Sequence, residues 1–366
     1  MNDFFVAQLL AWFDVHKRDL PWRHTQNPYF IWLSEIILQQ TRIAQGLPYY
    51  ENFVKTFPTI TDLAQADQEQ VLRLWQGLGY YSRARNMHQT AQEIFFEKNS
   101  LFPNNFSDLK KLKGIGDYTA AAIASFAFDE KVAVVDGNVF RVLSRFFGIE
   151  QDIASGKGKK YFQEFAQAIL PTSQTATYNQ AIMEFGALHC SPQKPDCLSC
   201  VLQPNCVAFA QNKQSRLPIK TKKINTKDRF FDYLVFFYKD KFLLKVRTEG
   251  DIWQGLYDFC LVENQNCPPF LSDLYAFCVQ NELFFGEKTW KNTVLLKDVS
   301  ATHRHLLSHQ RIFAKFYLLE ISEQKFLEQL KNTYLLQEFD REQIQNLPKP
   351  ILIANYVEKN LFKIFV

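Results

Sequence analysis

The stretch Leu112-Lys113-Gly114-Ile115-Gly116 decides the fold. Two glycines bracket one apolar residue, which predicts a tight turn between two helices, expected over residues 106–111 and 118–128. The second helix would begin with free backbone N–H groups that can hold a phosphate. Taken alone, this turn fits a plain connection between helices equally well. It is too short for a dinucleotide-binding fingerprint, and the residues before it do not form a strand pattern.

A carboxylate follows this turn about twenty residues later, in Val134-Val135-Asp136-Gly137-Asn138-Val139. An aspartate before glycine is most often a turn residue or a helix N-cap. Here an apolar run carries Asp136 toward the predicted phosphate-binding turn, where a bound sugar could develop positive charge. Asn138 is expected either to cap the next helix or to hold Asp136 through a hydrogen bond.

Four of the seven cysteines lie within seventeen residues, in the pattern Cys190-x6-Cys197-x2-Cys200-x5-Cys206. Four thiolates can bind zinc or an iron–sulfur cluster. Zinc sites usually pair their ligands in two short hooks, and only Cys197 and Cys200 form one, so the spacing favours [4Fe-4S]. Buried free thiols are the alternative. Prolines break this segment into loops, however, and loops rarely form an apolar core.

The composition is that of an ordinary globular protein. The 366 residues suffice for two domains, 47% of them are hydrophobic and 22% are charged. A net charge of +4 permits nucleic-acid binding without demanding it. We expect no signal peptide and no membrane span. The odd cysteine count argues against disulfides and favours a reducing cytosol, with Cys260, Cys267 and Cys278 as ordinary thiols.

The pattern changes along the chain. Residues 1–212 show apolar side chains at intervals of three and four, which predicts helices, including an apolar helix over 31–41. Residues 213–229 hold seven basic residues and one acidic residue and are predicted to be a linker. Residues 230–366 combine a predicted hairpin, a further strand and helical stretches, so an α+β domain is expected there.

Three further stretches resemble one family. They are Leu20-Pro21-Trp22-Arg23, Trp32-Leu33-Ser34-Glu35-Ile36-Ile37-Leu38-Gln39-Gln40-Thr41 and Trp75-Gln76-Gly77-Leu78-Gly79-Tyr80-Tyr81-Ser82-Arg83-Ala84-Arg85. With the turn, Asp136 and the cysteines, they make nearly the whole chain similar to the helix-hairpin-helix DNA glycosylases, and within these to the MutY-type adenine glycosylases. The resemblance implies a mainly α region formed by a six-helix module and an iron–sulfur module, with the [4Fe-4S] loop at 190–206. It also implies a Nudix-like α+β domain at 230–366 that recognises 8-oxoguanine.

The resemblance implies a base excision repair enzyme that hydrolyses the N-glycosidic bond of adenine mispaired with 8-oxoguanine or guanine in double-stranded DNA. It further implies a monomer in a bacterial-type cytoplasm, at the nucleoid, without membrane contact. The rival is an endonuclease III-like pyrimidine glycosylase and AP lyase. That branch carries a lysine nucleophile where this chain has Tyr118, and it lacks an acid matching Glu35. We therefore expect a monofunctional enzyme, or one with weak lyase activity at most. A catalytically silent DNA-binding protein with a structural metal is a third possibility, which the two carboxylates oppose.

The resemblance also assigns the site. Glu35 would protonate the adenine as general acid, although its pattern alone indicates a solvated helix position. Asp136 would stay ionised and stabilise the sugar cation, while Tyr118 and Asn138 position or shield the sugar. The base pocket would consist of Trp22, Arg23, Leu38 and Gln180. The DNA contacts would be Gln40, Thr41, Tyr80, Gly114, Gly116, Ser308 and His309, with Lys194 and Arg216 near phosphates. The cluster ligands would be Cys190, Cys197, Cys200 and Cys206.

Two features of the C-terminal part qualify the resemblance. Residues 253–259 resemble the opening of a Nudix box, but residues 260–270 lack its paired metal-binding glutamates, so this domain is not expected to hydrolyse anything. The family's Phe-Ser-His recognition loop corresponds here to Leu307-Ser308-His309. Leucine replaces the aromatic residue, which leaves the preference for 8-oxoguanine over guanine open.

Overall fold

The computed structural model describes residues 2–221, 226–248, 250–264 and 293–364. The chain forms two compact units, one of Met1–Gln65 with Asn86–Lys223 and one of Ala66–Arg85 with Ile224–Val366. The last of the three junctions, between Lys223 and Ile224, falls inside the predicted linker. Cys267, Cys278 and most of the stretch 260–270 lie outside the described residues. Among the helices that the structure describes, none combines the length and apolar character that a membrane crossing requires.

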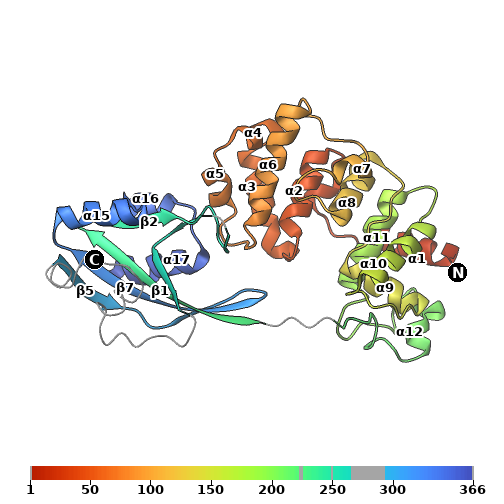
Figure 1. Ribbon diagram of the computed structural model, residues 1–366. Helices are drawn as coiled ribbons and strands as arrows, with labels where there is room; N and C mark the ends of the chain where they lie inside the picture. The colour runs from red at the N-terminus through yellow and green to blue at the C-terminus, as the bar shows by residue number, and fades with distance from the viewer. Residues whose placement is uncertain (1, 222–225, 249, 265–292, 365–366) are drawn as a thin grey trace. The chain divides into compact units, whose positions relative to one another are not determined.

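The first unit is helical (Figure 1). Its elements are α1 (Asn2–His16), η1 (Pro21–Arg23), α2 (Pro28–Leu38), α3 (Ile43–Thr56), α4 (Ile60–Gln65), most of α6 (Ser82–Glu97), α7 (Phe106–Leu109), α8 (Asp117–Phe128), α9 (Gly137–Phe147), α10 (Gly156–Ala168), α11 (Thr175–Leu188), η2 (Gln203–Asn205) and α12 (Val207–Ala210).

Local capping explains where α2 begins and ends. The Asn27 side chain accepts a hydrogen bond from the Tyr29 N–H at 3.0 Å, and Pro28 occupies the first helical turn, where its missing N–H is harmless. The helix ends at Leu38, and Gln40 adopts a left-handed φ of 56°. The prediction of a helix continuing to Thr41 is therefore wrong in its last turn.

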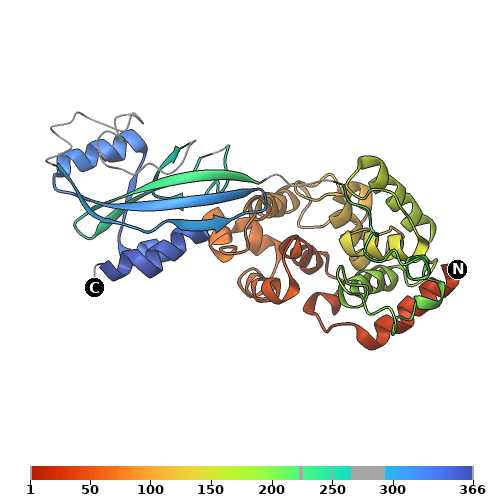
Figure 2. The same ribbon diagram turned by 90° about the horizontal axis from the view of Figure 1, so that it is seen from below.

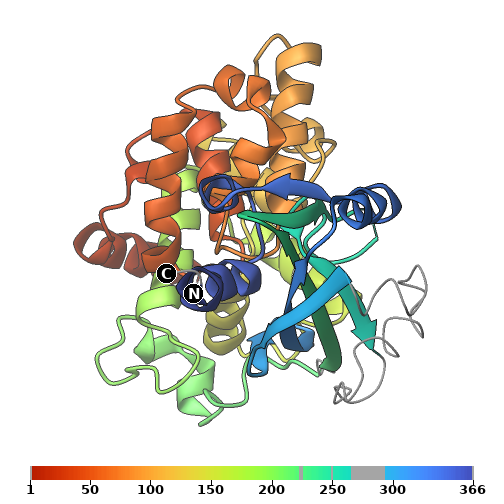
Figure 3. The same ribbon diagram turned by 90° about the vertical axis from the view of Figure 1, so that its left-hand side faces the viewer.

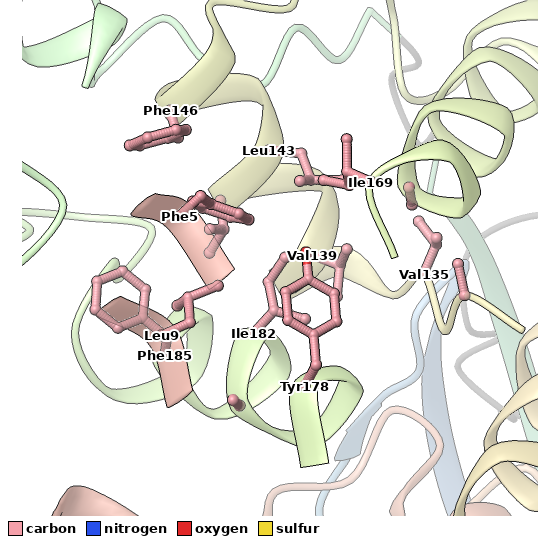
Figure 4. Close-up of a cluster of buried hydrophobic side chains, with 14 of the residues drawn as sticks. Phe5, Leu9, Val135, Val139, Leu143, Phe146, Ile169, Tyr178, Ile182 and Phe185 are labelled. Atoms are coloured by element: carbon pink, nitrogen blue, oxygen red, sulfur yellow. The ribbon is translucent and has the colours of Figure 1, made fainter. Parts of the chain in front are cut away.

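A buried apolar cluster joins α1, α9 and α11 (Figure 4). Phe5 of α1 and Phe146 of α9 pack with ring centroids 4.6 Å apart, and Tyr178 of α11 lies 6.5 Å from Phe5. Val135, which directly precedes Asp136 in the chain, belongs to the same cluster. Burial of these side chains therefore fixes the backbone from which Asp136 projects.

The second unit contains a mixed sheet. Its strands are β1 (Lys227–Tyr238), β2 (Lys241–Val246), β3 (Tyr257–Asp258), β4 (Cys260–Asn264), β5 (Val294–Val299), β6 (His303–Leu306), β7 (Gln310–Ile321) and β8 (Gln337–Phe339). The order is β3-β2-β1-β7-β5, with β4 pairing to β1, β6 to β7 and β8 to β2. The predicted β1–β2 hairpin is present, and β1 runs parallel to β7.

Helices cover both faces of this sheet (Figures 2 and 3). The helices of this unit are α5 (Gln68–Leu74), α15 (Gln324–Tyr334), α16 (Arg341–Asn346), α17 (Ile351–Tyr356) and α18 (Phe362–Ile364), with the π-helical turn η3 (Val357–Leu361), and α15 and α17 lie on opposite faces of the sheet. Phe326 of α15 packs in one cluster with Leu319 of β7. Phe316 lies three residues before Leu319 in β7, so its side chain points to the opposite face of the sheet. Tyr356 of α17 stacks on Phe316 there, with ring centroids 3.8 Å apart.

Residues 66–85 join this second unit through polar contacts of their own. The Tyr257 hydroxyl donates to the Glu69 carboxylate at 2.7 Å, and the Arg85 guanidinium donates to the Gln254 carbonyl at 2.8 Å. The sequence patterns, which divide the chain at 213–229, do not indicate these pairings, because the partners lie about 170 to 190 residues apart.

Candidate active site

The hairpin depends on its first glycine. Gly114 has a φ of 76°, and a Cβ atom there would lie 2.8 Å from the Cβ of Asn86, so a larger residue would be strained and would clash. The Thr90 hydroxyl holds the turn by donating to the Lys113 carbonyl at 2.6 Å. Gly116 has an ordinary φ of −90°, caps α8 and has open space around it. The absent side chain thus leaves the N-terminus of α8 open to a phosphate.

Asp136 caps α9. Its Oδ1 accepts the N–H groups of Asn138 and Val139, both at 2.8 Å, and its Oδ2 accepts the Asn138 side-chain amide at 2.7 Å. Of the two roles expected for Asn138, the structure shows the second, which is to hold Asp136. Burial raises the pKa of Asp136, and these hydrogen bonds oppose the rise because they favour the charged form. The three hydrogen bonds therefore hold the Asp136 carboxylate in one orientation.

Glu35 projects from α2 and is partly buried. Its pKa is raised to about 7, mainly by burial; the charge of Asp136 adds to the rise and a hydrogen bond from the Tyr118 hydroxyl opposes it. The pKa of Tyr118 lies well above its usual value, because of burial and then the charges of Glu35 and Asp136. The two carboxylates therefore meet around one tyrosine, and Glu35 is the one of the pair that can carry a proton near neutral pH.

A small cavity opens beside Glu35. Of the four residues predicted for the base pocket, Trp22, Arg23 and Gln180 line it. Leu38 does not line it, and its side chain packs instead over Gly46, where a Cβ atom would come within 2.7 Å. The cavity is completed by residues that sequence reasoning missed, namely Ile31, Ser34, Phe126 and Met183. Met183 lies three positions after Gln180, on the same face of α11, which is the signal that could have indicated it.

A buried acid fixes the pocket arginine and was also missed. Glu184 is 2% exposed and accepts hydrogen bonds from the two terminal nitrogens of the Arg23 guanidinium, at 3.0 and 2.9 Å. Arg18 donates to the same carboxylate through its backbone N–H at 3.0 Å and its Nε at 2.8 Å. Burial alone would raise the pKa of Glu184, but the hydrogen bonds from Arg18 and then Arg23 lower it to about 2. Glu184 therefore stays ionised and holds Arg23 in place.

The residues predicted to contact DNA fall in two places. Gln40, Thr41, Gly114 and Gly116 belong to the first unit, the first pair in the turn after α2 and the glycines in the hairpin. In the second unit, Tyr80, Ser308 and His309 line one cavity of about 470 Å³ together with Trp253. The Tyr80 and Ser308 hydroxyls are hydrogen-bonded, and Tyr80 is 41% exposed with a left-handed φ of 49°.

The four clustered cysteines are free thiols, each partly buried. The Arg145 guanidinium donates to the Cys190 sulfur at 3.4 Å, and Cys200 and Cys206 accept backbone N–H groups. Burial raises the pKa of Cys200 and Cys206, and the N–H donors oppose that rise because they favour thiolates, the form that binds metals. This donor set fits a thiolate-bound cluster. Within the described ranges, no three His, Cys, Asp or Glu side chains stand close enough together to hold a single ion.

Arg141 connects this cysteine segment to the carboxylate. Its guanidinium donates to the Cys190 carbonyl at 2.7 Å and to the Asn138 side-chain oxygen at 2.8 Å, while Asn138 donates to Asp136. The order of the segment around Cys190 is thereby coupled to the orientation of Asp136. Lys194 and Arg216, predicted to lie near phosphates, are both exposed.

Comparisons with known proteins identify the family and the fold. Residues 33–177 match the family described as HhH-GPD superfamily base excision DNA repair protein. The chain is 37% identical to the adenine DNA glycosylase of Buchnera aphidicola subsp. Schizaphis graminum, over 70% of this chain and 74% of the relative. Identity is 34% to that of Buchnera aphidicola subsp. Baizongia pistaciae, over 84% of each chain. The chain is 41% identical to the adenine DNA glycosylase of Rattus norvegicus, over 58% of this chain and 43% of the relative.

Solved structures show the same helical fold. A thermostable thymine-DNA glycosylase matches with a TM-score of 0.53 and 28% identity, over 57% of this chain and 97% of that one. An endonuclease III in a non-covalent DNA complex matches with a TM-score of 0.51 and 22% identity, over 58% and 96%. The chain therefore belongs to the adenine DNA glycosylases of the HhH-GPD superfamily of base excision repair proteins.

Proposed function

We propose that this protein hydrolyses the N-glycosidic bond of adenine mispaired with 8-oxoguanine or guanine in double-stranded DNA. One observation carries the proposal: Glu35, with its pKa raised to about 7, and Asp136, held by three N–H donors, meet around Tyr118. A cavity lined by Trp22 and Gln180 adjoins Glu35. A base must leave the helical stack to reach such a recessed pair.

Glu35 is the proposed general acid. Adenine is a poor leaving group as an anion, and protonation of its ring nitrogen lets a neutral base depart. A carboxyl group with a pKa near 7 is protonated in a large fraction of molecules at neutral pH, and it still transfers its proton readily. The Tyr118 hydroxyl also hydrogen-bonds to this carboxyl group.

Asp136 is the proposed stabiliser of the sugar. Loss of the base leaves a cation-like sugar, and a fixed carboxylate beside it lowers the energy of that transition state. The three N–H donors keep Asp136 oriented, and water completes the hydrolysis. Tyr118 occupies the position at which a lysine would form a Schiff base, so the reaction would end at the abasic site.

The second unit supports the proposed recognition of the opposing base. Its sheet is consistent with the Nudix-like domain predicted from sequence, and Tyr80, Ser308 and His309 share one cavity. An aromatic ring at a left-handed turn is suited to fill the space left by an unstacked base. The Ser308 hydroxyl and the His309 imidazole can donate hydrogen bonds to the opposing base.

The direct test uses labelled duplexes that contain A:8-oxoguanine, A:G, A:T or a thymine glycol. The proposal predicts release of adenine from the first two, seen as strand cleavage only after alkali. The A:T duplex should stay intact. Cleavage at thymine glycol without alkali would instead indicate the pyrimidine glycosylase and lyase activity and would contradict the proposal.

We also propose that Cys190, Cys197, Cys200 and Cys206 bind a [4Fe-4S] cluster. When bound, the cluster would cross-link the loop 190–206, and no step of the hydrolysis needs its electrons. The chain's own contribution is the set of donors around the sulfurs, with Arg145 at Cys190 and backbone N–H groups at Cys200 and Cys206.

The purified protein is expected to be brown, with broad visible absorption and about four irons per chain. Replacing Cys200 with serine should abolish the colour, because thiolates are the ligands. The matched control is Cys260→Ala in the core of the second unit, which should leave the colour unchanged. A colourless protein that contains one zinc per chain would contradict the cluster.

A further inference from the structure

The segment that leads to Asp136 has an unusual environment. Residues 131–136, here the lead-in segment, belong to no helix or strand, yet Val132, Ala133, Val134 and Val135 are all at most 9% exposed. Buried backbone N–H and C=O groups require partners, and a strand next to them would normally supply these. Side-chain amides supply them here.

Asn179 of α11 serves one edge of the lead-in segment. Its side-chain oxygen accepts the Val134 N–H at 3.2 Å, and its side-chain nitrogen donates to the Val132 carbonyl at 2.9 Å. The same nitrogen donates to the Ser125 hydroxyl of α8 at 2.9 Å. Asn179 is 1% exposed, so a single side chain joins the lead-in segment to α11 and to the second helix of the hairpin.

Two glutamines of α10 serve the opposite edge. The Gln163 amide donates to the Ala133 carbonyl at 2.9 Å, and the Gln167 oxygen accepts the Ala133 N–H at 2.9 Å. Gln167 also donates to the Lys131 carbonyl at 3.0 Å. The backbone groups of residues 132 and 134 thus face α11, and those of 131 and 133 face α10, as in a strand between two neighbours.

We infer that Asn179 is a positioning residue for Asp136, which sets where that carboxylate stands relative to Glu35 by fixing the backbone two residues before it. The inference rests on the proposed role of Asp136. Asn179 is buried, while Gln167 on the opposite edge is exposed, so water can replace the glutamine but not the asparagine. Gln180, the next residue of α11, lines the base cavity, so the same helical turn aligns the lead-in segment and the pocket.

The test is the variant Asn179→Leu, which keeps the branched skeleton of the side chain and cannot form the three hydrogen bonds. We expect the single-turnover rate of adenine release from an A:8-oxoguanine duplex to fall by about 10²-fold, since a shift near 1 Å at a reacting group has an effect of that size. The Kd for the same duplex with a non-cleavable 2′-fluoro adenosine should change by less than about threefold, because Asn179 is buried and has no surface to offer to DNA. A change in Kd that accounts for the whole loss of activity would overturn the inference.

The same substitution in an Asp136→Asn protein distinguishes a positioning role of Asn179 from a general loss of structure. In a protein that already carries Asp136→Asn, Asn179→Leu should reduce the residual rate by less than about threefold, because the group that it positions has lost its charge. An equal further loss of about 10²-fold would show that Asn179 acts through something else. If the leucine variant does not fold, Asn179→Ser replaces it in both backgrounds, with a smaller expected loss of about tenfold.

The control Asp62→Ala removes a carboxylate in the first turn of α4, in the same unit. This carboxylate accepts the Thr59 N–H at 2.9 Å and makes no contact with the lead-in segment. The substitution should lower thermal stability while the rate stays within about threefold of that of the unmodified chain. An unmodified chain that releases no adenine would refute the proposed function itself. An active unmodified chain with an equally active Asn179→Leu variant would refute only the present inference.

Discussion

Replacing Glu35 with glutamine is expected to lower the rate of adenine release by about 10²- to 10⁴-fold, the range for loss of a general acid. Glutamine keeps the shape of the side chain and its contact with Tyr118, but it has no proton to give at neutral pH. The affinity for an A:8-oxoguanine duplex with a non-cleavable adenosine should therefore stay within about threefold. The measurement is a single-turnover rate beside a binding titration, with Glu51→Gln on the exposed surface of α3 as the control. Comparable turnover in both variants would remove Glu35 from the mechanism.

The pH dependence of the unmodified enzyme gives an independent readout. The active form of Glu35 is the protonated one and its pKa is about 7, so the rate should fall about tenfold per pH unit well above pH 7. On the acidic side the rate should fall where Asp136 becomes protonated, since that group must be ionised. The fall above pH 7 should be absent from the residual activity of Glu35→Gln. A rate that stays constant from pH 6 to 9 would contradict the assignment.

The same ionisation affects stability, with a definite sign. The pKa of Glu35 is raised from about 4.3 in the unfolded chain to about 7 in the folded one. The folded state therefore binds the proton more tightly, and its stability falls as the pH rises from about 4 through 7, by an amount on the order of 3 kcal/mol. Replacing Glu35 with glutamine removes the ionisable group and with it this pH-dependent loss of stability. The melting temperature of Glu35→Gln should exceed that of the unmodified chain at pH 8 and approach it at pH 4.

The parts of the site that sequence reasoning found are those with a local signature. Gly114 lies at a turn that requires a positive φ, and Asp136 precedes a helix that it caps. Each role can therefore be predicted from a few neighbouring residues. Glu35 has a weaker local pattern, that of a solvated helix position. Glu35 was identified only through the resemblance, and burial beside Tyr118 gives it a raised pKa that its sequence pattern does not indicate.

The parts that sequence reasoning missed depend on contacts between distant residues. Asn179 and Gln163 are ordinary polar residues in amphipathic helices, and nothing in their spacing indicates that they pair with the lead-in segment 30 to 47 residues earlier. Leu38 was assigned to the base pocket through the resemblance alone. In the structure α2 ends at Leu38, and that side chain packs over Gly46. Tertiary packing determines which residues such side chains contact, and these contacts cannot be inferred from a single sequence.

Replacing Asp136 with asparagine is expected to lower the rate of adenine release by about 10³-fold or more, because the fixed negative charge beside the sugar is lost. Asparagine caps helices about as well as aspartate, so α9 should remain intact and the free energy of unfolding should change by less than about 1 kcal/mol. Affinity for the non-cleavable duplex should hold. The control is Asp129→Asn, at an exposed left-handed position that asparagine tolerates.

Asp136→Ala separates the two roles of this side chain. Alanine removes both the charge and the cap, so it should lose the same activity as asparagine and, in addition, about 1 kcal/mol of stability measured by denaturant unfolding. If Asp136 mattered only as a cap, the asparagine variant would keep its activity and the alanine variant alone would fail. Equal loss of rate with unequal loss of stability therefore identifies the carboxylate charge as the catalytic element. The two backbone hydrogen bonds that cap α9, together with the bond from the Asn138 side-chain amide, also orient that charge, so the helix start and the catalytic group are one and the same structure.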